Sequence, residues 1–217
     1  SLGEIISSRE NENNDVGVPK TLLRGTESDA AYVLEMGMRG LGQIGRLSKI
    51  SEPDIAVITN VGQAHIGILG SRENIAKAKS EITSYLKSDG VVIIPFGDAL
   101  LEKAIREKWS GRIIRVAIEG FSLDWLRSDE YFAVKDIEPD YISQFDMQNN
   151  LISFEGIKLK LPLEGRHNAM NFLMALAVAT ELGLSIKNLN KLNINMPRGR
   201  NKLVNCGQFL VLDETYN

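Results

Sequence analysis

Three short, predominantly apolar runs, separated by helix-like segments, restrict the folds open to this chain more than any other feature. The runs are Ile55–Thr59, Val91–Ile94 and Ile113–Ala117, and helical patterns at Arg72–Leu86 and Leu100–Lys108 lie between them. A strand that is apolar on both faces is buried on both faces, which is typical of a parallel sheet covered by helices. The sequence therefore predicts an α/β domain with a mostly parallel sheet flanked by helices.

The segments before and just after this central region are predicted from their local patterns. Before it, we expect a short helical tail at Ser1–Arg9, a strand at Ala31–Glu35 and a short helix at Ile44–Ile50. After it, short alternating segments within Tyr131–Pro162, such as Leu151–Phe154, favour a small antiparallel sheet appended to the main one.

The last third of the chain is predicted to contain two helices, a hinge and a hairpin. Apolar helices are predicted at about Asn168–Leu182 and at Ile186–Leu192, and a hairpin is predicted at Lys202–Asp213. A Pro-Arg-Gly-Arg segment before the hairpin indicates a hinge. We therefore expect one domain over residues 1–197, followed at 198–217 by the hinge and the start of another domain.

Composition excludes several classes of protein. The 217 residues carry a net charge of −3, which gives no electrostatic basis for binding nucleic acid. No apolar run approaches the roughly 18 residues of a membrane helix, and no secretion signal is visible. The single cysteine cannot form an internal disulfide. We expect a cytoplasmic protein with neither nucleic-acid nor membrane partners.

The segment Gly40–Gly45 matches G-x-G-x-x-G, a pattern that receives a pyrophosphate in dinucleotide-binding folds. The preceding predicted strand ends near Glu35, which leaves a gap, and the next ends in Thr59-Asn60 instead of an acid for the ribose. A nicotinamide-dependent dehydrogenase therefore stays open as the alternative from another class, beside a flexible glycine loop at the sheet edge.

Polar residues follow two of the predicted strands. Glu35 ends one strand, and the loop after another carries Asn60 and His65. Ligands of open α/β sheets bind outside the carboxyl ends of the strands, and a carboxylate beside an imidazole suits a divalent metal that also holds phosphate oxygens. Taken singly, Glu35 also fits a capping or ion-pairing acid, and His65 a hydrogen-bonded loop residue.

Helical spacing separates the two lysines of Arg72–Leu86. Glu73, Lys77 and Glu81 lie four residues apart and predict an exposed ladder of ion pairs. Lys79 falls on the apolar stripe instead, where desolvation lowers the pKa of its amine. Two interpretations remain open: a lysine that extends past the edge of the core, or a functional amine, including one that forms a carbamate with carbon dioxide.

Two amides, Asn168 and Asn171, lie three residues apart just after His167. Together these side chains can read the edge of a purine, although an Asn N-cap is an equally open explanation. Arg200, in the predicted hinge, is either a solvated linker arginine or a guanidinium that reaches a phosphate when domains close.

In this order, the motifs resemble those of the Mur ligases of peptidoglycan synthesis. The stretches that carry the resemblance are Asn11–Pro19, Glu35–Gly37, Thr59–His65, Ala78–Ile82, Gly165–Asn171, Gly199–Arg200 and Asp213–Asn217. An Asn-Asn-x-x-Gly-Val-Pro segment points to the branch that adds D-alanyl-D-alanine to UDP-N-acetylmuramoyl-tripeptide. That segment argues against the folylpolyglutamate synthetases, which share the architecture.

The resemblance implies a P-loop NTPase-like Mur ligase central domain that uses ATP and Mg²⁺. ATP would phosphorylate a carboxylate of the UDP-linked peptide, and the incoming amine would then displace the phosphate. The metal would lie at Glu35, His65 and a carbamylated Lys79. The implied ATP contacts are His167, Asn168, Asn171, Arg200 and Glu214, and the implied contacts with the UDP-linked peptide are Asn13 and Asn14.

The sequence also departs from the family pattern. It contains no G-K-[ST] phosphate loop, which the resemblance places just upstream of Ser1. Glu10 stands where the family usually has Gly, and Glu214 where it usually has Asp. We therefore expect part of a longer ligase, monomeric when full length, with the fragment inactive alone. Other amide ligases of the Mur or folylpolyglutamate type, the dehydrogenase and a non-catalytic nucleotide-binding module remain the alternatives.

Overall fold

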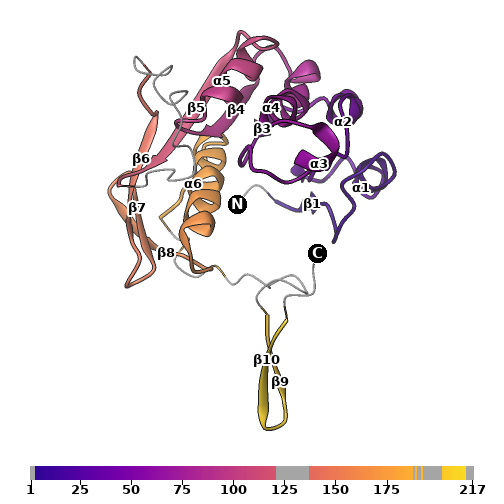
Figure 1. The fold of residues 1–217 in the computed structure, drawn as a ribbon. Coiled ribbons are helices and arrows are strands. Elements are labelled where there is room, and N and C mark those ends of the chain that lie inside the picture. Colours follow the sequence, from indigo (N-terminus) through magenta and orange to yellow (C-terminus); the bar gives the residue numbers. More distant parts are fainter. Residues whose placement is uncertain (1–2, 121–136, 188, 190–191, 193–201, 214–217) are drawn as a thin grey trace.

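The computed structural model describes residues 3–120, 137–187, 189, 192 and 202–213. Its largest sheet has six strands in the order β3-β4-β5-β6-β7-β8 (Figure 1). The parallel strands are β3 (Ile55–Val57), β4 (Val91–Pro95), β5 (Arg112–Ile118) and β6 (Tyr141–Asp146). The sheet continues antiparallel through β7 (Leu151–Phe154) and β8 (Ile157–Lys160). The predicted α/β class is confirmed, and the antiparallel strands extend the main sheet.

Both faces of this sheet are covered by helices. The helices of the N-terminal half are α1 (Gly17–Leu22), α2 (Gln43–Ser51), α3 (Ile66–Leu69), α4 (Arg72–Ser80) and α5 (Ala99–Arg106). Val92 and Ile94 of β4 belong to the core that these helices form. Val91 and Ile93 belong to a second core, on the other face, with α6 (Arg166–Glu181). This alternation within β4 explains why its sequence is apolar throughout.

Two further pairs of strands lie outside the six-stranded sheet. β1 (Ile5–Ser7) and β2 (Ala31–Val33) form a short parallel pair. The helical tail predicted at Ser1–Arg9 is therefore wrong in its described part, because the segment finds a strand partner that lies far along the chain. The hairpin predicted near the C-terminus is confirmed as β9 (Lys202–Cys206) and β10 (Phe209–Asp213).

The helix predicted over Arg72–Leu86 is divided in two. α4 ends at Ser80, and a 3-10 helix, η1 (Glu81–Tyr85), follows it directly. The tighter pitch of a 3-10 helix changes which side chains share a face. Glu81 is only 7% exposed, so the predicted exposed ladder is wrong at this position.

Some sequence predictions fall on parts of the chain outside the described residues. These are the segment Tyr131–Val134, three of the seven residues of the helix predicted at Ile186–Leu192, the hinge and the domain boundary after residue 197. They stay predictions. Within the described part of the chain, no helix is long and apolar enough to cross a membrane.

The α6 core makes a direct prediction about stability. Leu173 is fully buried against the sheet, whereas Leu182, at the end of the same helix, is 42% exposed. We expect Leu173→Ala to lower the free energy of unfolding by about 2–5 kcal/mol, because it removes packed methyl groups and leaves a cavity. Leu182→Ala should cost less than about 1 kcal/mol. Urea denaturation of both variants checks this, and equal losses would contradict the assigned core.

Candidate functional site

Two neighbouring cavities lie where the strands end. The first, of about 760 Å³, follows the carboxyl ends of β2 and β3, and the second, of about 560 Å³, lies between the ends of β3 and β4 and the start of α6. Five residues singled out in the sequence line the first cavity: Asn13, Asn14, Glu35, His65 and Lys79. The predicted gathering of Glu35, His65 and Lys79 from three separate elements is therefore present.

Asn13 holds the Glu35 carboxylate in the first cavity. Its Nδ2 donates to Glu35 Oε1 at 2.9 Å, and its backbone oxygen accepts from the Gly37 N–H at 2.7 Å. A Cβ atom at Gly37 would lie 2.9 Å from Asn13 Cγ, so a larger residue at this position would displace the Asn13 amide. The Asn-rich loop, Glu10–Asp15, and the end of β2 are thus joined at the cavity wall.

Asn14 has a local role beside its place in the cavity lining. Its Oδ1 accepts the backbone N–H groups of Val16 and Gly17, both at 3.0 Å. These donors lie at the beginning of α1, where backbone N–H groups have no intrahelical partner. Asn14 therefore fixes the direction in which the loop enters α1.

His65 is held by an unusual backbone conformation. Its φ is +68°, in the left-handed region, where a non-glycine residue is uncommon but histidine is tolerated. Its carbonyl oxygen accepts from the N–H groups of Ile68 and Leu69, which closes the first turn of α3. The imidazole is therefore set at the cavity by a tight turn whose strain is typical of functional sites.

Lys79 lies between the two cavities. Its Nζ donates to the backbone oxygen of Asn60 at 2.7 Å, and Asn60 lines the second cavity. Burial lowers the pKa of the Lys79 amine, and the negative charge of Asp98 opposes that shift in part. The predicted desolvation is confirmed, whereas Lys77, two residues earlier, is exposed.

Two side chains of the first cavity carry donor atoms for a divalent cation. Glu35 offers carboxylate oxygens and His65 an imidazole nitrogen, while Lys79 becomes an oxygen donor only if its amine carries a carboxylate. Among the described residues, no three or more His, Cys, Asp or Glu side chains gather as a metal site. Mg²⁺ needs few protein ligands, because it keeps waters and shares phosphate oxygens with its substrate.

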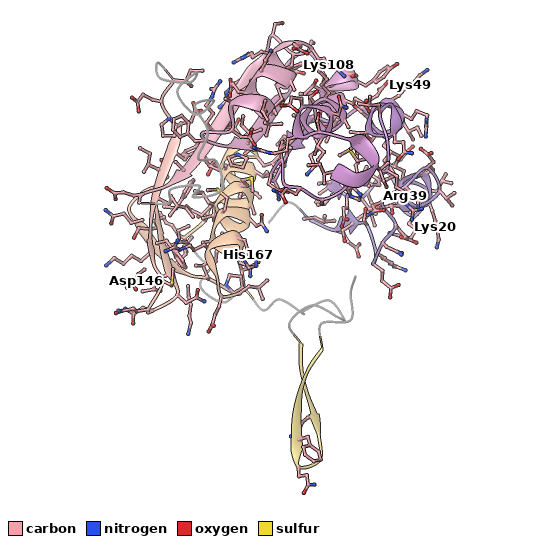
Figure 2. The ribbon with its side chains drawn as sticks, viewed as in Figure 1. Lys20, Arg39, Lys49, Lys108, Asp146 and His167 are labelled. Carbon is pink, nitrogen blue, oxygen red and sulfur yellow. The ribbon has the colours of Figure 1, made fainter. Side chains whose placement is uncertain are left out.

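The second cavity receives fewer of the predicted residues. His167 and Asn171 of α6 line it together with Arg72 and Asp98, and Figure 2 labels His167 near one end of α6. Asn168 does not line it, because its Nδ2 donates to the backbone oxygen of Glu164 at 2.7 Å. Of the residues predicted to contact a purine, His167 and Asn171 line this cavity, and the contact itself stays a prediction. Arg200 and Glu214 lie outside the described residues.

Sequence reasoning missed the partner of the glycine pattern. Glu81 Oε1 accepts the Gly42 N–H at 2.6 Å, and Glu81 Oε2 accepts the Gly45 N–H at 3.2 Å. The chain's own carboxylate therefore occupies the N-terminus of α2, where a dinucleotide fold would receive a pyrophosphate. The dehydrogenase alternative loses the feature on which it rested. The sequence feature that bears on this contact is Glu81 itself, an acid two residues after Lys79 of the apolar stripe.

Strand order and cavity position define the class of this chain: it is an open α/β domain with its cavities at the carboxyl ends of the strands, where ligands of such sheets generally bind. Residues 1–179 match the family described as the Mur ligase middle domain. The chain belongs to the Mur ligase family.

Similar proteins agree with this assignment. The chain is 39% identical, over its whole length, to the UDP-N-acetylmuramoyl-tripeptide--D-alanyl-D-alanine ligase of Synechocystis, of which it covers 44%. A crystal structure of MurF from Acinetobacter baumannii matches all of the chain with a TM-score of 0.78 at 30% identity, and 46% of that protein is covered. MurF of Thermotoga maritima, solved in complex with ADP, matches 99% of the chain with a TM-score of 0.72 at 25% identity and 48% coverage. The chain thus spans less than half the length of these relatives.

An ion-pair cluster anchors the Asn-rich loop beside the first cavity. The Glu12 carboxylate contacts the Arg24 guanidinium and lies 2.8 Å from Lys20 Nζ, both from the region of α1. Hydrogen bonds from Arg24 and then Lys20 lower the pKa of Glu12 from 4.5 to about 2. The loop that carries Asn13 and Asn14 is therefore tied to α1 by charge.

This shift predicts an acid-sensitive loop. Because the pKa of Glu12 is depressed in the folded state, its contribution to stability is present above pH 4.5 and is lost as the pH falls toward about 2. We expect Glu12→Gln to flatten the decline in the free energy of unfolding over that range, measured by urea denaturation at several pH values. Glu10→Gln, at an exposed acid of the same loop, is the control and should leave the decline intact.

Proposed function

We propose that this chain is the central ATP-binding part of a ligase that adds D-alanyl-D-alanine to UDP-N-acetylmuramoyl-tripeptide. The observation that carries the proposal is the 39% identity with the Synechocystis ligase of that name along the whole chain. ATP and Mg²⁺ are the proposed co-substrate and metal, and the ADP complex of the Thermotoga relative supports the nucleotide. A monomeric, cytoplasmic enzyme of peptidoglycan precursor synthesis is part of the same proposal.

The proposed reaction has two steps. A carboxylate oxygen of the tripeptide bonds to the γ-phosphorus of ATP, and the bond to the bridging oxygen breaks, so that ADP leaves. The amine of D-alanyl-D-alanine then bonds to the acyl carbon of the mixed anhydride, which releases inorganic phosphate and a proton. Such transfers depend mainly on positioning and on stabilisation of phosphoryl charge.

Two cavities that meet at the Lys79–Asn60 hydrogen bond suit a reaction that brings two substrates together. In the proposed arrangement, the first cavity takes the reacting end of the UDP-linked peptide and the second takes the adenine end of ATP. Glu35 and His65 would hold Mg²⁺, which would supply positive charge against the phosphate oxygens. Asn13 would keep the Glu35 carboxylate oriented, since its amide already donates to it.

The proposed modification of Lys79 rests on its environment. Burial lowers the pKa of this amine, and a neutral amine is the form that reacts with carbon dioxide. In that reaction a nitrogen–carbon bond forms and the nitrogen loses a proton, so the product is a carbamate with one negative charge. A carboxylate would then stand in the first cavity beside Glu35 and His65.

Phosphate release by the full-length ligase tests the proposal. Incubated with Mg-ATP and UDP-N-acetylmuramoyl-tripeptide, it should release phosphate in a manner that depends on added D-alanyl-D-alanine. Dependence on a different amine would keep the class of amide ligase and change the substrate. Absence of release with every amine would favour the non-catalytic nucleotide-binding module.

The two lysines of α4 provide a matched pair of variants. Lys79→Ala should lower the turnover of the full-length ligase by about 100-fold or more, because it removes charge stabilisation at the transferring group. Small carboxylates should restore part of that activity if a carbamate is the active form. Lys77→Ala changes an exposed residue of the same helix and should stay within about twofold of the parent enzyme. Similar losses in both variants would contradict the proposed role.

The two amides of α6 provide a second pair. Asn171→Ala should raise the KM for ATP by about tenfold, since it removes a polar contact from the second cavity. Asn168→Ala should leave that KM within about twofold, because the Asn168 amide is directed to the Glu164 carbonyl. Steady-state kinetics at saturating peptide substrate separate the two, and a larger effect at Asn168 would reverse the assignment.

A further inference from the structure

We infer that Glu81 is a positioning residue that holds one wall of the first cavity in place for the UDP-linked substrate. It acts through the glycine loop, defined here as Arg39–Gly45. The inference rests on the proposed function only in assigning the UDP-linked peptide to the first cavity. The hydrogen bonds of Glu81 are present in the structure whatever substrate the cavity takes.

Glu81 is a buried carboxylate with both oxygens engaged. It is 7% exposed, and its two oxygens accept the N–H groups of Gly42 and Gly45 at 2.6 and 3.2 Å. Gly42 is the N-cap of α2, so neither N–H has a partner within the helix. A carboxylate at this end is also favoured by the helix dipole, and hydrogen bonds to a charged acceptor are the stronger kind.

The glycine loop in turn forms part of the first cavity. Arg39, Gln43 and Ile44 line that cavity, and none of them lines the second one. The Arg39 N–H donates to Gln43 Oε1 at 2.6 Å, which closes the loop on itself. Figure 2 shows Arg39 in the N-terminal half of the molecule, well apart from His167 on α6. Anchoring this loop therefore sets the shape of one cavity only.

Lys79 and Glu81, two residues apart, thus determine two different features of the first cavity. Lys79, in the last turn of α4, presents its amine to the cavity, while Glu81, at the start of η1, turns toward α2. The wall held by Glu81 carries the exposed Arg39, whose guanidinium suits an anionic ligand such as a diphosphate or a carboxylate. Loss of the Glu81 hydrogen bonds should therefore weaken the binding of the UDP-linked substrate and leave the binding of ATP unchanged.

The same helix interface offers a control that leaves the loop alone. Ser48 is fully buried in α2, and its Oγ donates to the backbone oxygen of Ile82 at 2.7 Å. It lines neither cavity. Ser48→Ala therefore weakens the contact between α2 and η1 without removing an acceptor from Gly42 or Gly45.

The test compares Glu81→Gln with Ser48→Ala in the full-length ligase. Glutamine keeps the shape of the side chain but replaces one acceptor oxygen by an NH₂ group. We expect Glu81→Gln to raise the KM for UDP-N-acetylmuramoyl-tripeptide by about tenfold and to leave the KM for ATP within about twofold. Ser48→Ala should lower the melting temperature and leave both KM values within about twofold. Equal changes in the two KM values for Glu81→Gln, or no change, would overturn the inference.

Backbone amide exchange provides a readout that needs no activity. At least one of the Gly42 and Gly45 N–H groups should exchange about tenfold faster or more in Glu81→Gln than in the parent and in Ser48→Ala, because glutamine leaves one acceptor oxygen for two donors. Unchanged exchange at both glycines would also overturn the inference. A parent enzyme that releases no phosphate would overturn the proposed function instead, and the exchange result would still decide whether Glu81 holds the loop.

Discussion

Burial of β4 on both faces is the constraint on which the rest of this structure depends. All five of its residues are buried, with Val92 and Ile94 packed toward α4 and α5 and Val91 and Ile93 packed toward α6. A strand covered in this way needs helices above and below, and the connections between them bring the carboxyl ends of the parallel strands to one edge (Figure 1). The loops that follow those ends supply part of the lining of both cavities, and residues of α2, α4 and α6 supply more of it.

The segment from α4 to η1 carries charged residues with different roles. A regular α-helix over the whole segment would place Lys77 and Glu81 on one face, one turn apart. In the structure Lys77 lies in solvent, whereas the Glu81 carboxylate is buried against the glycine loop, whose N–H groups donate to it. Two charged residues four positions apart thus differ in role, because only Glu81 has buried donors within reach.

Sequence patterns predicted the features that depend on local periodicity. Short, predominantly apolar runs identified β3, β4 and β5, and the apolar stripe of the helix identified Lys79 as desolvated. The errors have one cause, a partner distant in the chain. Ile5–Ser7 is a strand because β2 pairs with it, and Glu81 is buried because two glycines more than thirty residues away donate to it. No local pattern records such partners.

The left-handed backbone at His65 has a consequence for how this position can vary among related chains. Asparagine and glycine meet the conformational demand of φ +68°, whereas a β-branched side chain does not. The backbone conformation of the turn therefore limits which residues can occupy position 65, before the chemistry of the side chain limits them further. Glycine at this position would relieve the strain. Histidine retained there among related chains would therefore indicate selection for the imidazole, whereas replacement by glycine would indicate selection for the turn alone.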